Sequence, residues 1–201
     1  MFVTCAAQLC VRAVTSGVVP ENPLEEKFNG IDLSNFWNVS AYALKEYVDD
    51  PLTAEKVTLV ERNLGYKLPA AYIALARLQN GGMPKNTNHR TQERTSWAAD
   101  HVAITGIYSI GSSKRYSLLG ELGSQFWIDM WGYPPIGVYF ADCPSAGHDM
   151  ICLDYRDCGP EGEPRVVHID QESDYKVTFV AESFEAFIRG LQGDDAFDLE
   201  A

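Results

Sequence analysis

The chain has 201 residues, which suits one medium-sized domain that can bury a hydrophobic core without disulfides or metal ions. Hydrophobic residues make up 46% of it and charged residues 22%, proportions typical of a folded protein, so general disorder is excluded. The formal net charge is −12 and no basic run offsets it. This balance argues against nucleic acid as a partner and favours a basic protein, unless the charge serves only solubility.

The cysteine usage indicates a reducing compartment. The five cysteines are an odd number, and no two have C-x-x-C spacing. The first nineteen residues lack the basic start of a secretory signal, and no run approaches the roughly eighteen apolar residues of a membrane helix. The sequence therefore predicts a cytoplasmic protein that contacts no membrane.

Residues 1–33 are interpreted as an N-terminal extension, because they show no clean hydrophobic period and contain Pro20 and Pro23. Their early β-branched residues suggest one added strand. The domain itself is predicted over residues 34–192. Residues 193–201 form an acidic tail that we expect to fray.

Three helices are predicted at the start of the domain, each between a residue that favours a helix start and one that stops it. Their approximate ranges are Ser40–Asp50, Thr53–Gly65 and Pro69–Gly82. Pro51 ends the first helix because the residue before a proline avoids helical geometry. Gly65 ends the second because glycine readily adopts a left-handed conformation.

The second half of the domain is predicted to consist mainly of strands. Residues 83–100 are polar and read as a long loop, whereas Val102–Ile110 has β-branched residues at alternating positions. Aromatic residues after Ser124 are spaced like one face of a helix up to Trp131. Further strands are predicted at Ile136–Asp142, Met150–Tyr155, Pro164–Asp170 and Lys176–Val180.

The final helix has the clearest pattern in the sequence. Phe184, Phe187, Ile188 and Leu191 lie at i, i+3, i+4 and i+7, so they share one stripe that should dock on the sheet. Short links between the strands favour antiparallel pairing. The order of elements predicts an α+β fold, with N-terminal helices, a mostly antiparallel central sheet and a C-terminal helix packed on that sheet.

The sequence offers three weak candidates for a chemical site. The cysteines from Cys143 to Cys158 lie near His148, but their spacings do not match those of zinc ligands. His148 precedes Asp149 in a turn, which leaves open a hydrolase that uses this region, although no nucleophile motif surrounds it. The segment 111–115 lacks the glycines and the ending of a phosphate loop. The sequence thus predicts no catalytic residue, no metal ion and no cofactor.

Aromatic and acidic residues gather between residues 127 and 161. Exposed aromatic side chains rimmed by carboxylates are typical of a surface that binds a basic partner. The alternative is that the aromatic residues form the core and the acids only face water. The candidate partner-binding residues are Trp127, Trp131, Tyr133, Asp142, His148, Asp149, Asp157 and Glu161.

Several motifs occur together in one order. Residues 61–82 read E-R-N-L-G-Y-K-L-P-A-A-Y-I-A-L-A-R-L-Q-N-G-G. This segment resembles the opening of the SUKH superfamily, in which a helix ends at Leu-Gly, Leu-Pro begins a second helix that carries Tyr, and Asn-Gly-Gly closes it. The matching positions are Leu64-Gly65, Leu68-Pro69, Tyr72 and Asn80-Gly81-Gly82. Residues 137–155, 162–170 and 181–188 continue the similarity, which covers about residues 34–191.

The resemblance implies an α+β domain without cofactor or catalytic residues. The superfamily includes a fungal regulator of cell-wall synthesis and many bacterial immunity proteins. The resemblance therefore also implies a protein-binding domain that neutralises a toxin. The net negative charge predicts that the toxin domain is basic. A cytoplasmic regulatory or adaptor scaffold is the first alternative, and the hydrolase is the second. The oligomeric state stays open.

Overall fold

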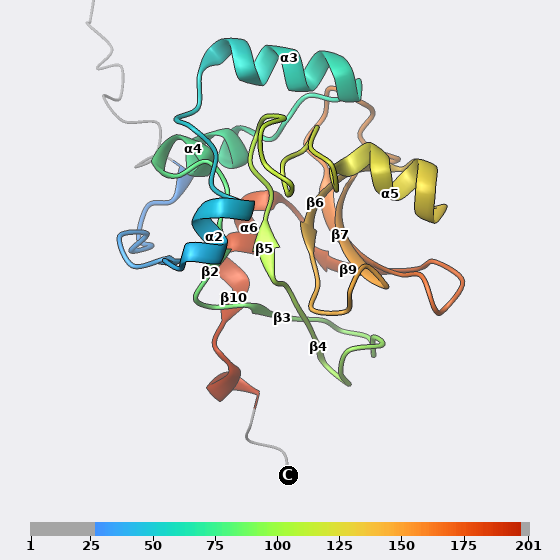
Figure 1. The fold of residues 1–201 in the computed structure, drawn as a ribbon. Coiled ribbons are helices and arrows are strands. Elements are labelled where there is room, and N and C mark those ends of the chain that lie inside the picture. Colours follow the sequence, from blue (N-terminus) through green and yellow to red (C-terminus); the bar gives the residue numbers. More distant parts are fainter. Residues whose placement is uncertain (1–26, 198–201) are drawn as a thin grey trace, which may run out of the picture.

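The computed structural model describes residues 27–197 (Figure 1). The strand predicted within the N-terminal extension lies outside these residues. The remaining chain has the predicted α+β architecture, in which helices cover an antiparallel sheet. Within residues 27–197, no helix combines the length and the apolar character needed to cross a membrane.

The three predicted N-terminal helices are present, and their starts follow the expected capping chemistry. The Ser40 hydroxyl accepts a hydrogen bond from the Ala43 amide, and the Thr53 hydroxyl accepts one from Lys56. Gly65, with φ 76°, ends the second helix as predicted. The helices of the described chain are α2 Ala41–Glu46, α3 Ala54–Leu64, α4 Ala70–Leu78, α5 Ser124–Trp131 and α6 Phe184–Gly190.

Two of these helices are shorter than predicted. Helix α2 ends at Glu46 rather than near Asp50, because Tyr47 turns into the core and its hydroxyl binds Asp142. Helix α4 ends at Leu78, ahead of the glycine pair. Gly81 follows with φ 85° and lies so close to the Tyr47 carbonyl and Ser109 that no side chain fits there.

The central sheet has five antiparallel strands in the order β5-β6-β7-β8-β9. Strands β6 to β9 lie within one residue of the predicted bounds, because each is a short, mostly apolar run between turn residues. The bounds are β5 Gly106–Ile107, β6 Gly137–Asp142, β7 Asp149–Asp154, β8 Arg165–Asp170 and β9 Lys176–Ala181.

The prediction of a long loop over residues 83–100 is wrong in part. This stretch contributes two short strands to small sheets that non-local partners complete. The bounds are β1 Trp37–Asn38 with β2 Met83–Pro84, and β10 Leu191–Gln192 with β3 Asn88–Arg90 and β4 His101–Ala103. The predicted strand Val102–Ile110 is split between two sheets, as β4 and β5.

The beginning of the acidic tail is ordered rather than frayed. Asp194–Ala196 form a short 3₁₀ helix, and the Asn88 amide donates to the Asp194 carboxylate at 2.6 Å. The Phe197 ring lies 4.2 Å from the ring of His101. The tail therefore packs against β3 and β4.

Helices α5 and α6 lie on opposite faces of the central sheet. Phe140 contacts Phe184 and Phe187 of α6, whereas the ring of the adjacent Tyr139 packs on Tyr133, which in turn contacts Trp127 of α5. Neighbouring strand residues point to opposite faces, so the two helices enclose the sheet. Tyr72 of α4 stacks on Phe184 at 4.6 Å and extends the core toward α4.

Candidate functional site

Strand β7 carries a buried carboxylate at each end, and these two ends differ in chemistry. Asp149 begins the strand and is 5% exposed, and Asp154 ends it and is 2% exposed. We call the Asp149 side the turn end, because turns 143–148 and 171–175 and the last turn of α5 meet there. We call the Asp154 side the arginine end.

At the arginine end, fixed cations pair with the acids. Arg156 and Arg165 donate to the Asp154 carboxylate at 2.8 and 3.0 Å, and Arg165 also pairs with Asp157 at 2.9 Å. Burial alone raises the pKa of Asp154, but the hydrogen bonds from Arg156 and Arg165 outweigh it and hold the pKa below its usual value. Glu161 is exposed beside Tyr66 and lines a hollow of about 230 Å³.

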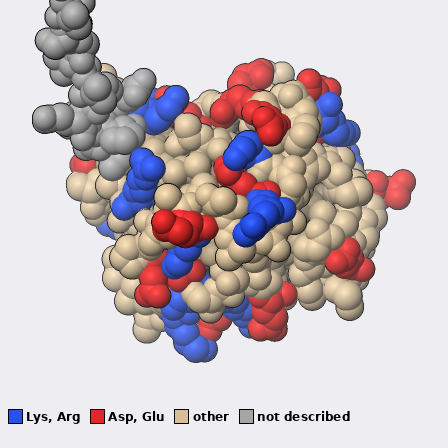
Figure 2. Space-filling view, turned by 90° about the horizontal axis from the view of Figure 1, so that it is seen from above, with Lys and Arg blue, Asp and Glu red and all other residues tan. Residues whose placement is uncertain are grey.

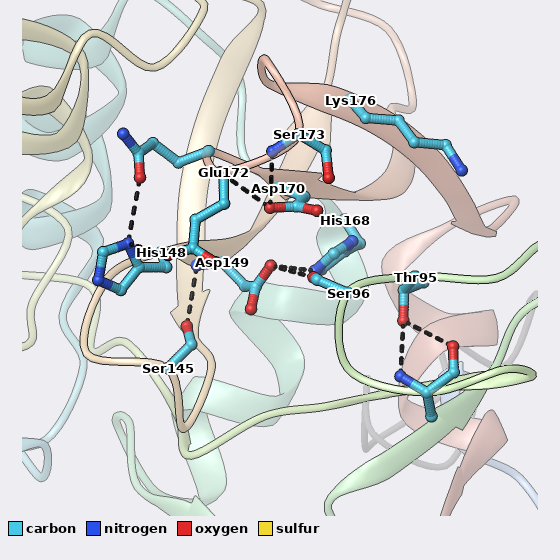
Figure 3. A network of polar contacts seen from close by, with 12 residues as sticks. Thr95, Ser96, Ser145, His148, Asp149, His168, Asp170, Glu172, Ser173 and Lys176 are labelled. Atoms are coloured by element: carbon cyan, nitrogen blue, oxygen red, sulfur yellow. Dashed lines mark hydrogen bonds and ion pairs between the residues drawn. The ribbon is translucent and has the colours of Figure 1, made fainter.

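At the turn end, a histidine and two serines surround Asp149 (Figure 3). One carboxylate oxygen accepts from the Ser96 hydroxyl at 2.7 Å and lies 3.1 Å from Nε2 of His168. The Asp149 amide donates to the Ser145 hydroxyl at 2.8 Å. Burial raises the pKa of Asp149, but the hydrogen bonds from His168 and Ser96 outweigh it, so the carboxylate is ionised near neutral pH.

His168 is the main residue that the sequence analysis missed. It is 1% exposed, and its second ring nitrogen, Nδ1, has no hydrogen-bond partner within residues 27–197. The strand pattern could have indicated that His168 is buried, because His168 pairs with Ile151 and so lies on the same apolar face of the sheet. A hollow of about 370 Å³ lies over it, lined by Arg94, Thr95, Ser96, His168, Asp170, Ser173, Lys176 and Thr178.

The geometry gives no nucleophile–base pair in this network. Ser96 and His168 both bind Asp149 rather than each other. His148 lies 3.1 Å from the Gln171 amide oxygen and 3.6 Å from Glu172, and the Ser145 hydroxyl accepts from a backbone amide. These contacts orient side chains and turns and place no hydroxyl or thiol against an imidazole.

The structure separates the eight predicted partner-binding residues into three groups. Four are buried and so belong to the interior of the fold, namely Trp127, Tyr133, Asp142 and Asp149. Trp131 is partly exposed and lies 5.7 Å from the ring of His148 at the turn end. Asp157 and Glu161 are exposed at the other end of β7. Contact with a partner stays a prediction for the exposed members.

Asp142 is held in the core by a tyrosine. The Tyr47 hydroxyl lies 3.0 and 2.9 Å from its two oxygens. Burial raises the pKa of Asp142 to about 7, and the hydrogen bond from Tyr47 lowers it only in part. This carboxyl group is therefore a structural feature of the junction between α2 and β6.

The distribution of cations distinguishes the two ends. No Lys or Arg occurs in residues 116–155 or 166–175, which supply α5 and both turns of the turn end. By contrast, Figure 2 shows acidic and basic side chains interspersed on the face seen from the α3 side. No group of three His, Cys, Asp or Glu side chains in the described part of the chain is arranged to hold a metal ion.

The fold defines an α+β domain with an antiparallel central sheet, and polar groups gather at both ends of strand β7. The SMI1 / KNR4 family (SUKH-1) model matches residues 51–190, so this chain belongs to that family. The matched residues include α3, α4 and α5, the whole central sheet and α6. No curated protein matches the sequence.

Proposed function

We propose that this chain is an immunity-type protein, a cytoplasmic domain that neutralises a bacterial toxin by direct binding and without catalysis. Membership of the SUKH-1 family carries the proposal, because the superfamily includes many immunity proteins. The net charge of −12 agrees with it, since such a field speeds encounter with a basic toxin domain and disfavours acidic proteins.

Neutralisation would consist of covering the functional surface of the toxin. The exposed carboxylates would steer the encounter, and partly exposed aromatic side chains such as Trp131 would anchor the complex. The buried Asp149 and His168 side chains, together with Ser96 on the exposed loop 91–100, serve this mechanism by holding the turns in place, since their hydrogen bonds are made within the fold.

Co-expression with the toxin domain encoded by the neighbouring gene tests the proposal. We expect cells to survive when the chain is present and to die without it, and an inactive form of the toxin to bind the purified chain by calorimetry. The association rate should fall as salt is added, because salt screens the steering charges. Equal killing with and without the chain contradicts the proposal, and stable association with cellular proteins would then favour the regulatory scaffold.

A further inference from the structure

The turn end displays an apolar pair within an acidic rim. Met130 and Trp131 form its centre, since Met130 is 72% exposed and Trp131 is partly exposed. His148 contacts Trp131 and also lies 3.6 Å from Glu172, so α5 and both turns meet here. We call this the Met130 surface, and it consists of Asp129, Met130, Trp131, His148, Glu172 and Asp174.

The Met130 surface is built on fixed supports. Gly147 has φ 98°, and a side chain there would lie 2.6 Å from the ring of Trp127, so turn 143–148 packs directly on α5. The Tyr175 hydroxyl donates to the Trp131 carbonyl and ties the second turn to the end of α5. A surface that is already ordered loses little entropy when a partner binds.

The rim is acidic and lacks neutralising cations. Asp129, Glu172 and Asp174 make no ion pair with Lys or Arg in the described part of the chain. Arg94 and Lys176 line the hollow over His168, and Lys176 pairs with Glu93 at 3.4 Å. At the arginine end, in contrast, Arg165 already pairs with Asp157.

We infer that the Met130 surface binds a cationic segment of the partner protein. An Arg or Lys side chain lies along Met130 and over the Trp131 ring, where the apolar stem is buried and the cation meets the aromatic face. Its charged head pairs with Glu172 and Asp174. The inference rests on the proposed function for the identity of the partner, but the chemistry of the surface can be tested separately.

The first test uses a defined probe, an amidated hexapeptide of alternating arginine and leucine, titrated into the isotope-labelled protein by NMR. We expect chemical-shift changes at the Trp131 indole and at the amides of Glu172 and Asp174. The double variant Glu172→Lys/Asp174→Lys should bind about tenfold more weakly, equivalent to about 1.4 kcal/mol. Its matched control, Glu161→Lys/Glu182→Lys, changes the net charge equally on exposed positions elsewhere and should bind like the wild type.

Shift changes centred on Tyr66, absent shift changes, or equal weakening by both double variants would overturn the inference. Circular dichroism of each variant checks that the fold is kept. Because the substituted side chains are exposed, we expect unfolding midpoints close to that of the wild type.

The second test uses the inactive toxin domain and separates the inference from the proposed function. Met130→Ala should weaken binding severalfold, whereas Leu59→Ala, which truncates an exposed residue of α3, should not. If the wild type binds the toxin and Met130→Ala and Glu172→Lys/Asp174→Lys bind equally well, the surface is wrong and the function stands. If the peptide binds at Trp131 but the toxin does not bind at all, the function is wrong and the surface stands.

Discussion

The two ends of β7 place the same chemical group, a buried aspartate, in two different environments. Asp154 is bound by Arg156 and Arg165, whose guanidinium groups remain partly exposed to solvent. Asp149 is bound by His168, which is buried with it, and by Ser96 of the exposed loop 91–100. Arg156 and Arg165 pair with Asp154 and Asp157 at the arginine end, whereas Glu172 and Asp174 at the turn end pair with no Lys or Arg among the described residues.

This difference indicates which end is prepared for a partner. Acids that already pair with arginine contribute little to binding, because a new cation would have to displace an existing one. Acids without a fixed partner can pair with a cation from outside the chain. The Asp149 carboxylate below them is already satisfied within the fold, since Ser96 and His168 both bind it.

Removal of Asp149 should have the largest effect. Asp149→Ala leaves the buried ring of His168 without any hydrogen-bond partner, so we expect the free energy of unfolding to fall by about 4 kcal/mol. Urea denaturation at pH 7 measures it. The double variant Asp149→Ala/His168→Leu is the control and should recover part of the loss, because it removes the stranded polar group. A loss below about 1 kcal/mol for the single variant would mean that the network does not hold the turn end together.

Asp142 is a third buried carboxyl group, and it is bound by the Tyr47 hydroxyl rather than by an arginine or a histidine. Its pKa of about 7 exceeds that of an unfolded chain, so the folded state binds more protons between pH 4 and 7. Stability from this group is thus present below pH 4 and is lost as the pH rises toward 7. Asp142→Asn should remove that dependence and stabilise the protein by on the order of 3 kcal/mol at pH 8.

Thermal unfolding of the wild type and Asp142→Asn across pH 4 to 8 gives the comparison. Parallel curves for the two proteins would contradict the raised pKa. Tyr47→Phe serves as the matched variant, because it removes the hydroxyl that binds the carboxylate and keeps the ring, and it should steepen the loss of stability toward pH 8.

Removal of Asp154 should have the smallest effect of the three, although Asp154 is the most buried. Arg156 and Arg165 can turn into solvent when the carboxylate is lost, so Asp154→Ala should cost about 2 kcal/mol at pH 7. Because its pKa is lowered, this contribution is present above pH 4 and disappears as the pH falls below that value. Urea denaturation at pH 7 and pH 3 measures the loss of stability and its pH dependence. A loss equal to that of Asp149→Ala would contradict the proposed difference between the two ends of β7.

Local chemistry made most of the fold predictable. The caps at Ser40 and Thr53, the stop at Gly65 and the short apolar runs of β6 to β9 are encoded within a few residues. Strand β3 escaped prediction because Asn88–Arg90 is polar and short, and its pairing with β10 joins segments about a hundred residues apart. Such pairing leaves no local period to detect.

The site was predictable only in part, for the same reason. Trp131 and His148 were both candidates from the sequence, and the structure places their rings 5.7 Å apart, but their contact with a partner stays a prediction. Trp127 and Tyr133 are buried, because α5 turns them toward β6, and composition alone does not fix that rotation. The pairing of Asp149 with His168 depends on the register of β7 against β8, which becomes apparent only in the assembled sheet.

The packed rings of Tyr72, Phe140 and Phe184 have a consequence for biosynthesis. Their contacts join α4 to α6, which are far apart in the sequence. One face of the sheet therefore stays uncovered until the ribosome has synthesised α6. Until α6 emerges, the nascent chain exposes an aromatic surface that is prone to aggregation. The synthesis of α6 therefore sets when this aromatic face of the sheet is covered, and chaperones would act on the chain before that point.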